Sequence, residues 1–110
     1  MIRAGDLNRR IRIQRRTEAQ DDLGQQVEAW EDIGDPTWAS ILVVSGKEYV
    51  LASGEVSRAE ASIRVRWRTD LTAQMRIIHS GVIYNILAVL PDMAGREYVD
   101  LPCSTGANNG

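Results

Sequence analysis

The sequence predicts a mainly β protein, a small closed or partly open antiparallel β-barrel of about six or seven strands with one short helical insertion. Three observations lead to this fold class. Short segments alternate apolar and polar residues with the two-residue period of a half-buried strand. Turn-forming residues separate these segments at intervals of roughly 8–12 residues, a spacing that favours a small barrel or sandwich. The 110 residues are 44% hydrophobic and 25% charged, the balance of one ordinary globular domain.

The first two strands are joined by a turn. Residues 10–16 alternate isoleucine with arginine or glutamine, which leaves one apolar face and places Gln14 on the polar face. Turn-forming residues follow, and residues 25–31 resume as a strand with Val27 and Trp30 as its packing side chains. Because Val27 and Trp30 lie on opposite parities, this strand needs a bulge or burial on both faces.

The third predicted strand, residues 38–44, is a nearly continuous apolar run. Such a strand is either buried on both faces or closes a barrel while facing a partner. The three tryptophans are the expected core anchors, with an anchoring role in an interface as the alternative: Trp30, Trp38 and Trp67.

A helical insertion is predicted after this strand. Ser45-Gly46-Lys47-Glu48 has the spacing of a capping box, so a short helix is expected over residues 49–52, ending near Gly54. The same spacing recurs from Ser57 to Glu60 and allows a second short helix. The segment has little apolar surface to offset its ordering entropy, so we expect it to be mobile in the free protein.

Residues 62–68 show the clearest strand alternation in the chain. Ile63, Val65 and Trp67 share one face, and the other face carries Arg64, Arg66 and Arg68. The arginine stripe is a candidate contact for a subunit, a partner or DNA, as are Arg10 and Arg12 on the first strand. The alternative for the stripe is a solvated strand face paired with acidic residues.

The last strands complete the predicted barrel. Residues 75–79 and 82–89 flank Ser80-Gly81, which reads as a tight hairpin turn. A final strand is expected over residues 98–103, and residues 104–110 should form a disordered tail. Residues 1–103 are therefore expected to be a single domain.

Charge is unevenly distributed along the chain. The net charge is −2 with a pI near 5.3, which argues against a generally basic nucleic-acid binder. Residues 1–16 hold six arginines and one acid, whereas residues 17–35 hold seven acids and no base. Either these segments become neighbouring strands with ion pairs across the sheet, or identical subunits use the opposite charges on each other.

No catalytic, metal or cofactor site is predicted. The single histidine, His79, is expected as a structural residue at a hairpin corner, and the single Cys103 as a small buried hydrophobe. Asp21-Asp22 is better explained by a turn than by a metal site. The N-terminal residues lack the apolar region of a signal peptide, and no apolar run is long enough to span a membrane.

The order of these features resembles the head–tail joining proteins of tailed bacteriophages, also called the head-completion or stopper family. The resemblance extends from about Gly5 to Cys103, with Trp67 standing where the family more often has tyrosine. The matching segments, in order, are Gly5-x-Leu7-x-x-Arg10-Ile11, Asp22-x-Gly24 before Trp30, Trp38-Ala39-x-Ile41, Gly46-x-Glu48, Ile63-Arg64-Val65-Arg66-Trp67, Met75-Arg76-Ile77 and Gly81-Val82-x-Tyr84-Asn85-Ile86. The motif residues expected to be structural are Trp30, Trp38, Trp67, Tyr84 and Ile86.

The resemblance implies a small β-barrel with an inserted helix and no enzyme activity or cofactor. It implies a virion protein, assembled in the bacterial host cytoplasm, that forms a ring at the portal vertex, closes or extends the DNA channel and docks the tail. The implied partners are a portal or adaptor ring protein, a tail-terminator or tail protein, other copies of the chain and the packaged double-stranded DNA, with no membrane. The mobile insertion is the implied docking or channel loop, with Gly46, Lys47, Glu48, Gly54 and Arg58.

A second interpretation remains open from the residues alone. The arginine stripe on a barrel-like pattern would also suit an OB-like domain that binds single-stranded nucleic acid. Such proteins usually interleave aromatic residues with the basic ones, whereas Trp67 lies on the opposite face of the strand from the stripe.

Overall fold

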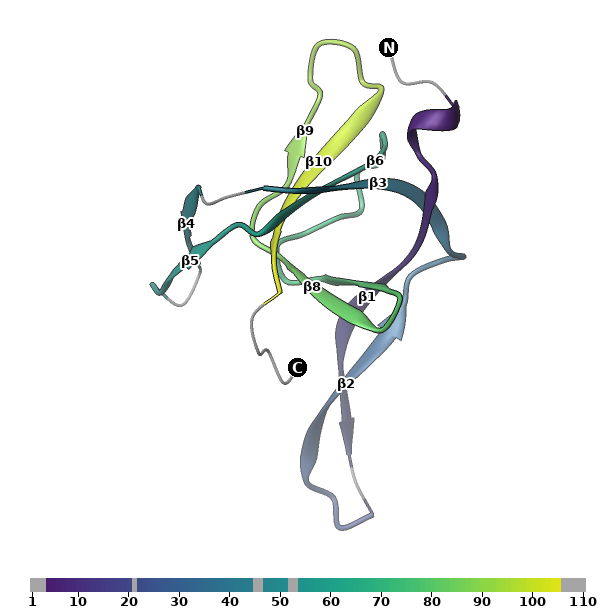
Figure 1. Cartoon of the computed structure of the whole chain (residues 1–110). Helices are drawn as coiled ribbons and strands as arrows, with labels where there is room; N and C mark the ends of the chain where they lie inside the picture. The colour runs from purple at the N-terminus through teal and green to yellow at the C-terminus, as the bar shows by residue number, and fades with distance from the viewer. Residues whose placement is uncertain (1–3, 21, 45–46, 52–53, 106–110) are drawn as a thin grey trace.

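A closed β-barrel and a long hairpin that projects from it make up the computed structural model (Figure 1). The structure describes residues 4–20, 22–44, 47–51 and 54–105, with the backbone alone at residues 4, 18–20 and 26–28. A short 3-10 turn precedes the first strand. The elements are η1 (Ala4–Asp6), β1 (Arg9–Gln20), β2 (Gln26–Asp32), β3 (Thr37–Val43), β4 (Glu48–Val50), β5 (Val56–Arg58), β6 (Ala61–Arg66), β7 (Arg76–His79), β8 (Val82–Ile86), β9 (Leu90–Pro91) and β10 (Tyr98–Ser104).

The barrel is an antiparallel sheet in the order β1-β3-β6-β10-β8-β7, and pairing of β7 with β1 closes it. Strand β2 extends this sheet beyond β1, β9 pairs with β10, and β4 and β5 form a separate two-stranded sheet. The predicted mainly β fold with a closed barrel is confirmed. Closure leaves the six barrel strands without free edges, which is how small all-β domains avoid edge-to-edge association.

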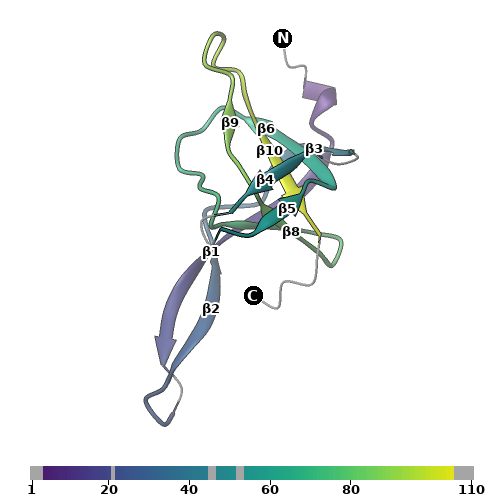
Figure 2. The same ribbon diagram turned by 90° about the vertical axis from the view of Figure 1, so that its left-hand side faces the viewer.

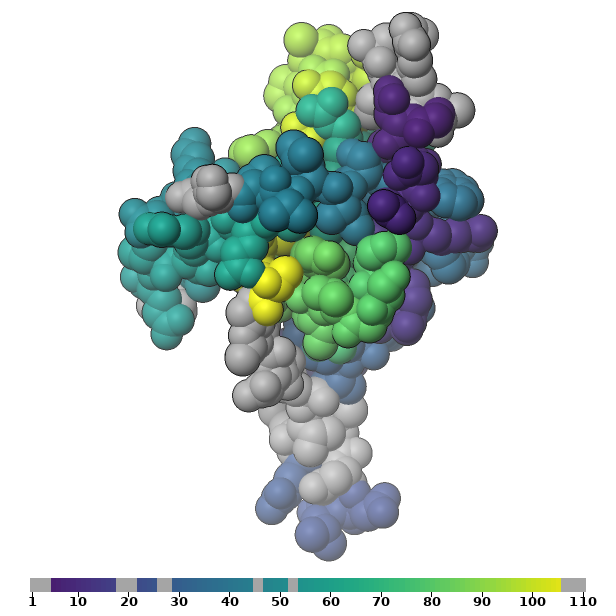
Figure 3. Space-filling model, viewed as in Figure 1, coloured from purple at the N-terminus to yellow at the C-terminus, as the bar shows by residue number. Residues whose placement is uncertain are grey.

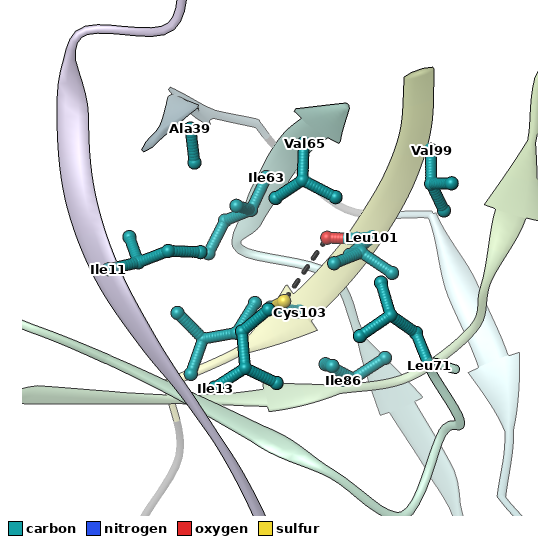
Figure 4. Packing of buried hydrophobic residues seen from close by; sticks show 11 residues of the cluster. Ile11, Ile13, Ala39, Ile63, Val65, Leu71, Ile86, Val99, Leu101 and Cys103 are labelled. Atoms are coloured by element: carbon teal, nitrogen blue, oxygen red, sulfur yellow. Dashed lines mark hydrogen bonds between the residues drawn. The ribbon is translucent and has the colours of Figure 1, made fainter. Parts of the chain in front are cut away.

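The core is formed by the inward faces of the barrel strands. Ile11, Ile63, Ile77, Val99 and Leu101 are fully buried, as the alternation of their strands predicts. Figure 4 shows that the labelled core side chains converge from different strands on one centre. Cys103 belongs to this cluster, and its Sγ donates a hydrogen bond to the Leu101 carbonyl at 3.1 Å.

Strand β1 is longer than predicted and belongs to two parts of the molecule. Its first half pairs with β3 and β7 in the barrel, through residues 9–11 and 12–14 respectively. Gln14 also pairs with Asp32 on β2, and the second half of the strand, residues 15–20, pairs with β2 alone. We call residues 15–31, the part of this hairpin beyond the barrel, the arm (Figure 2). Six strand residues extend about 20 Å, so the arm is a substantial projection.

The predicted helix over residues 49–52 is wrong where the structure describes it. Glu48–Val50 and Val56–Arg58 pair as antiparallel strands, and this pairing also replaces the second short helix allowed at Ser57. Gly54, with φ of +89°, lies in the turn between them. Cross-strand pairing of Val50 with Val56 uses β-branched side chains that favour a strand over a helix.

The third strand is not buried on both faces. Ala39 is fully buried, but Trp38 keeps 50% of its surface exposed and Leu42 keeps 64%. Trp38 is therefore not a core anchor. Of the two alternatives for this strand, burial on both faces is wrong, and the closing of the barrel fits the structure, while the partner on its other face stays a prediction. Strand β3 crosses the front of the barrel in Figure 3.

Candidate interaction surfaces

A polar network holds the base of the arm against the barrel. Arg12 Nε and Gln14 Nε2 donate to the two carboxylate oxygens of Asp32, at 2.9 and 2.8 Å. The Gln14 side-chain oxygen accepts from Arg76 Nε on β7 at 2.9 Å. Gln14 is only 7% exposed, so it lies inside the protein and not on the solvated polar face that its alternation predicts. This buried amide links three strands at the point where the arm leaves the barrel.

Trp30 also packs at the place where the arm leaves the barrel. The Arg76 guanidinium lies 4.1 Å from the centroid of its ring, and the Arg16 guanidinium lies 5.5 Å from it. Trp30 is half-buried and stands between basic side chains, so its role is to fix the arm and not to fill the barrel core. The side chain of Val27, the other predicted packing residue of this strand, lies outside the described side chains.

The arm confirms the simpler interpretation of the charge pattern at its base. Arg15 forms an ion pair with Glu31, its cross-strand partner on β2, and Arg12 pairs with Asp32. Hydrogen bonding by Arg12, reinforced by Gln14, lowers the pKa of Asp32. Opposite charges of the two segments therefore meet within one chain near the barrel.

The arginine stripe on β6 is largely neutralised. Arg64 forms two hydrogen bonds with Asp100, at 2.7 and 2.9 Å, and stacks 3.8 Å from the centroid of the Tyr98 ring. Arg68 lies beyond the strand end and forms two bonds of 2.6 Å with Asp70, which lower the pKa of that carboxyl group. For Arg64 the interpretation of a strand face paired with acids is thus confirmed, whereas Arg68 is paired with an acid but lies outside the strand.

Arg66 differs from its two neighbours in the stripe. Its side chain is exposed, and it makes no hydrogen bond or ion pair with another described residue. Tyr98 lies directly opposite it on β10, and Trp38 lies one residue beyond the Ala39–Val65 pair on β3, at the same level of the sheet.

The outer surface of the barrel thus brings together residues from several strands. Arg10 pairs with Trp38 across β1 and β3, and its guanidinium lies 5.4 Å from the Trp38 ring centroid. We call the surface formed by Arg10, Trp38, Leu42 and Arg66 the outer face. The sequence predicted Arg10 and Arg66 as contacts, whereas for Trp38 it favoured a core role and left an interface role as the alternative. The alternation of the strand could have indicated the interface role. Trp38 and Leu42 fall on the same side of the strand, and Ala39, which is buried, falls on the other.

The predicted docking loop is a hairpin with exposed apolar residues. Glu48 and Arg58 pair across β4 and β5 at 3.7 Å, and Lys47 lies 5.8 Å from the Tyr49 ring centroid. Val50 and Val56 are exposed on this hairpin. Gly46 lies outside the described residues, so the structure does not place that part of the predicted loop.

The remaining motif residues support the barrel. Ile86 is buried in the core cluster, and Trp67 and Tyr84 pack against that cluster while partly exposed. The Ser80-Gly81 turn is confirmed, with φ values of +50° and +79°. Its neighbour His79 donates through Nδ1 to the Arg10 carbonyl at 3.0 Å, a structural role that matches its prediction.

The described residues offer little for catalysis. Burial raises the pKa of the Cys103 thiol to about 12, which disfavours the nucleophilic thiolate, as its predicted core role implies. No group of three or more His, Cys, Asp or Glu side chains in the described ranges could hold a metal ion. None of the described helices is both long and apolar enough to cross a bilayer.

Comparisons with known proteins agree with the sequence resemblance. The phage head completion protein family matches the chain over residues 2–106. The chain is 29% identical over 108 residues to the head completion protein gp7 of Enterobacteria phage HK97, covering 94% of this chain and 96% of that protein.

Two solved structures are also similar. The solution structure of protein SF1141 from Shigella flexneri 2a has 35% sequence identity and a TM-score of 0.72, covering 97% of this chain and 99% of that one. A chain from the virion of a native gene transfer agent particle shares the fold, with 21% identity, a TM-score of 0.61 and coverage of 90% and 96%. With a family match along nearly its whole length and a barrel shared with these structures, the chain belongs to the phage head completion protein family, a family of structural virion proteins and not of enzymes.

Proposed function

We propose that the chain completes DNA-filled heads by forming a ring at the portal vertex, where it closes or extends the DNA channel and docks the tail. The observation that carries the proposal is the match to head completion proteins along residues 2–106. The structure supports it with a rigid closed barrel, a projecting arm and an open outer face. These features suit a protein whose work is to contact others.

The proposed partners follow from that position. A portal or adaptor ring protein lies on one side of the ring, a tail-terminator or tail protein on the other, and further copies of the chain lie alongside. Packaged double-stranded DNA occupies the channel. The β4–β5 hairpin, with Lys47, Glu48, Gly54 and Arg58, is the candidate docking or channel loop because its exposed valines leave apolar surface for a partner.

The test uses DNA-filled heads assembled without this chain. Purified protein is added, and electron microscopy locates it while tail joining and DNA retention are measured. We expect density at the portal vertex only, together with recovery of tailed particles that keep their DNA.

Binding spread over the capsid surface, or full DNA retention and tail joining in heads that never received the protein, would contradict the proposed function. The matched control is the same addition to heads that already contain the chain, in which no further binding is expected.

A further inference from the structure

We propose that the acidic tip of the arm of one copy docks on the outer face of a second copy. The inference rests on the ring of the proposed function and deepens it by naming the two surfaces that meet. The outer face supplies Arg10, Trp38, Leu42 and Arg66, and the arm tip supplies Asp22 and Leu23.

The outer face has the residue types that are typical of a protein-binding surface. Trp38 is half-exposed at its centre, Leu42 lies four residues further along on the same side of β3, and Arg10 and Arg66 flank Trp38. An exposed tryptophan between arginines is the residue combination enriched where protein interfaces gain most of their binding energy. The neighbouring Arg64 is already paired with Asp100, so the net positive charge of the outer face comes from Arg10 and Arg66.

The arm tip is complementary in charge and in apolar character. Residues 17–35 contain seven acids and no base, and the two at the base of the hairpin, Glu31 and Asp32, are paired within the chain by Arg15 and Arg12. Asp22 at the tip is exposed and makes no hydrogen bond or ion pair with another described residue. Leu23 beside it is 84% exposed. An apolar side chain next to a carboxylate can contact Trp38 or Leu42 while the carboxylate approaches an arginine.

The arm cannot make this contact within its own chain. Figures 1 and 2 show the arm leaving the barrel and pointing away from β3 and β6. The polar network at Gln14 and the stacking on Trp30 hold it in that direction. A contact between different surfaces of identical chains is head-to-tail, which is the kind that generates rings when the rotation closes.

Nucleic acid is the less favoured occupant of this face. Two of the three arginines of the stripe are neutralised by Asp100 and Asp70, and Tyr98 is covered by Arg64. Trp38 is the exposed aromatic residue that remains, whereas tracking of a strand of bases uses several aromatic platforms together with a continuous basic groove.

The experiment traps the contact with a disulfide between two differently tagged variants of the full chain. Gln25→Cys labels the arm tip and Ser40→Cys labels the outer face between Trp38 and Leu42, so neither substitution removes a residue of the proposed contact. Cys103 stays in place because burial keeps its thiol unreactive. Under mild oxidation of the mixture we expect the mixed disulfide to form roughly tenfold faster than either symmetric one, with the advantage lost at high salt.

Charge reversal supplies the specific control. Arg66→Glu in the Ser40→Cys chain should abolish the excess of the mixed disulfide, and Asp22→Lys in the Gln25→Cys chain should restore it. Ala73→Glu, which adds a negative charge at an exposed position between β6 and β7 that is not part of the outer face, should change nothing.

Three outcomes would overturn the inference: equal rates for the three disulfides, indifference of the mixed disulfide to Arg66→Glu, or protection of the Ser40→Cys thiol by labelled single-stranded DNA without a mixed disulfide. If the mixed disulfide fails while added protein still binds at the portal vertex, the arm contact is wrong and the proposed function stands. If the mixed disulfide forms while the protein does not bind the portal vertex, the proposed function is wrong and the contact stands.

Discussion

Gln14 shows how one side chain positions a whole element. Its amide bonds to Asp32 and Arg76 at once, and it is almost fully buried. We expect Gln14→Ala to lower the free energy of unfolding by about 1–3 kcal/mol, because it removes the hydrogen bonds of a buried amide to two charged side chains. Urea denaturation measures this. Arg15→Ala, which removes the exposed pair with Glu31, is the control and should cost less than about 1 kcal/mol. Equal losses in the two variants would contradict the role of Gln14.

Two paired carboxylates give the fold a predictable acid sensitivity. The pKa of Asp32 and that of Asp70 are lowered in the folded protein, chiefly by hydrogen bonds from Arg12 and Arg68. In the unfolded chain both return to about 3.9, so below that pH the unfolded state binds more protons. Stability should therefore be fully present above about pH 5 and fall as the pH approaches the folded-state values.

Urea midpoints measured across this range test the sign of the effect. The Asp32→Asn variant should be less stable at neutral pH and should lose less stability on acidification. A wild-type midpoint that rises as the pH falls would contradict the assignment.

A substitution at Arg66 is expected to impair assembly of the particle without impairing folding of the chain. The side chain is exposed, so Arg66→Glu should change stability by no more than about 0.5 kcal/mol. The same variant should nevertheless leave filled heads without tails or with lost DNA. Thermal denaturation and counts of tailed particles measure the two effects, with Ala73→Glu as the control for a negative charge added elsewhere on the surface. A normal yield of tailed particles from Arg66→Glu would return Arg66 to a solvated role.

Trp38 shows that residue type can predict a strand without predicting whether the strand is buried on both faces. The apolar run of residues 38–44 correctly predicts a strand, because β-branched and aromatic residues suit a pleated surface. It does not determine whether the second face is covered by the same chain or left for another. Trp38 and Leu42 are exposed because no other described element crosses that side of the barrel, a fact of tertiary arrangement and not of local pattern.

Among the elements, the β7–β8 turn has the most direct consequence for stability. Ser80 and Gly81 both have positive φ, the geometry of a type I′ turn, for which asparagine followed by glycine is preferred. Ser80→Asn should therefore stabilise the fold by roughly 0.5 kcal/mol, and Gly81→Ala should destabilise it by about 1 kcal/mol. Thermal denaturation of both variants checks the prediction, which fails if the two shifts share a sign.

The β4–β5 hairpin should be the least protected element of the described chain. It pairs over only three residues on each side, and Val50 and Val56 are exposed. Such a two-stranded sheet is marginal alone in water. Amide exchange should be fast over residues 47–51 and 54–58 and slow over residues 63–67 in the free protein. Equally strong protection of both segments would make the hairpin part of the core and would contradict the prediction that it is a mobile docking loop.

The elements show why the sequence predicts strands better than their ends. Alternation ends at Arg16 because β1 leaves the barrel there, and a strand outside the core has no buried face to require apolar residues. The helix predicted after Ser45 failed for a related reason. Capping-box spacing and a four-residue apolar stretch fit a helix or a hairpin equally, and the pairing of Val50 with Val56 decides between them.

For the whole molecule, the short alternating strands predict a small barrel or sandwich, and the ordered motifs predict the family, but neither shows how the sheet closes. The closing pair β1–β7 joins residues about 64 positions apart and leaves no local signature in either strand. The candidate surfaces also combine features that the local sequence predicts with features that depend on pairing between distant strands. The charged residues that form them could be named from the sequence, whereas the neutralisation of Arg64 by Asp100 depends on register across β6 and β10.

Because β1 runs without a break from the barrel into the arm, the length of the arm can change only by whole strand residues. Removing one residue from each of its two strands would turn every side chain beyond the cut to the opposite side, so the tip would present the wrong surface. Removing two from each strand keeps the orientation and shortens the reach by about 7 Å. Arms in related chains should therefore differ by even numbers of residue pairs, and each step would set a different spacing between neighbouring barrels.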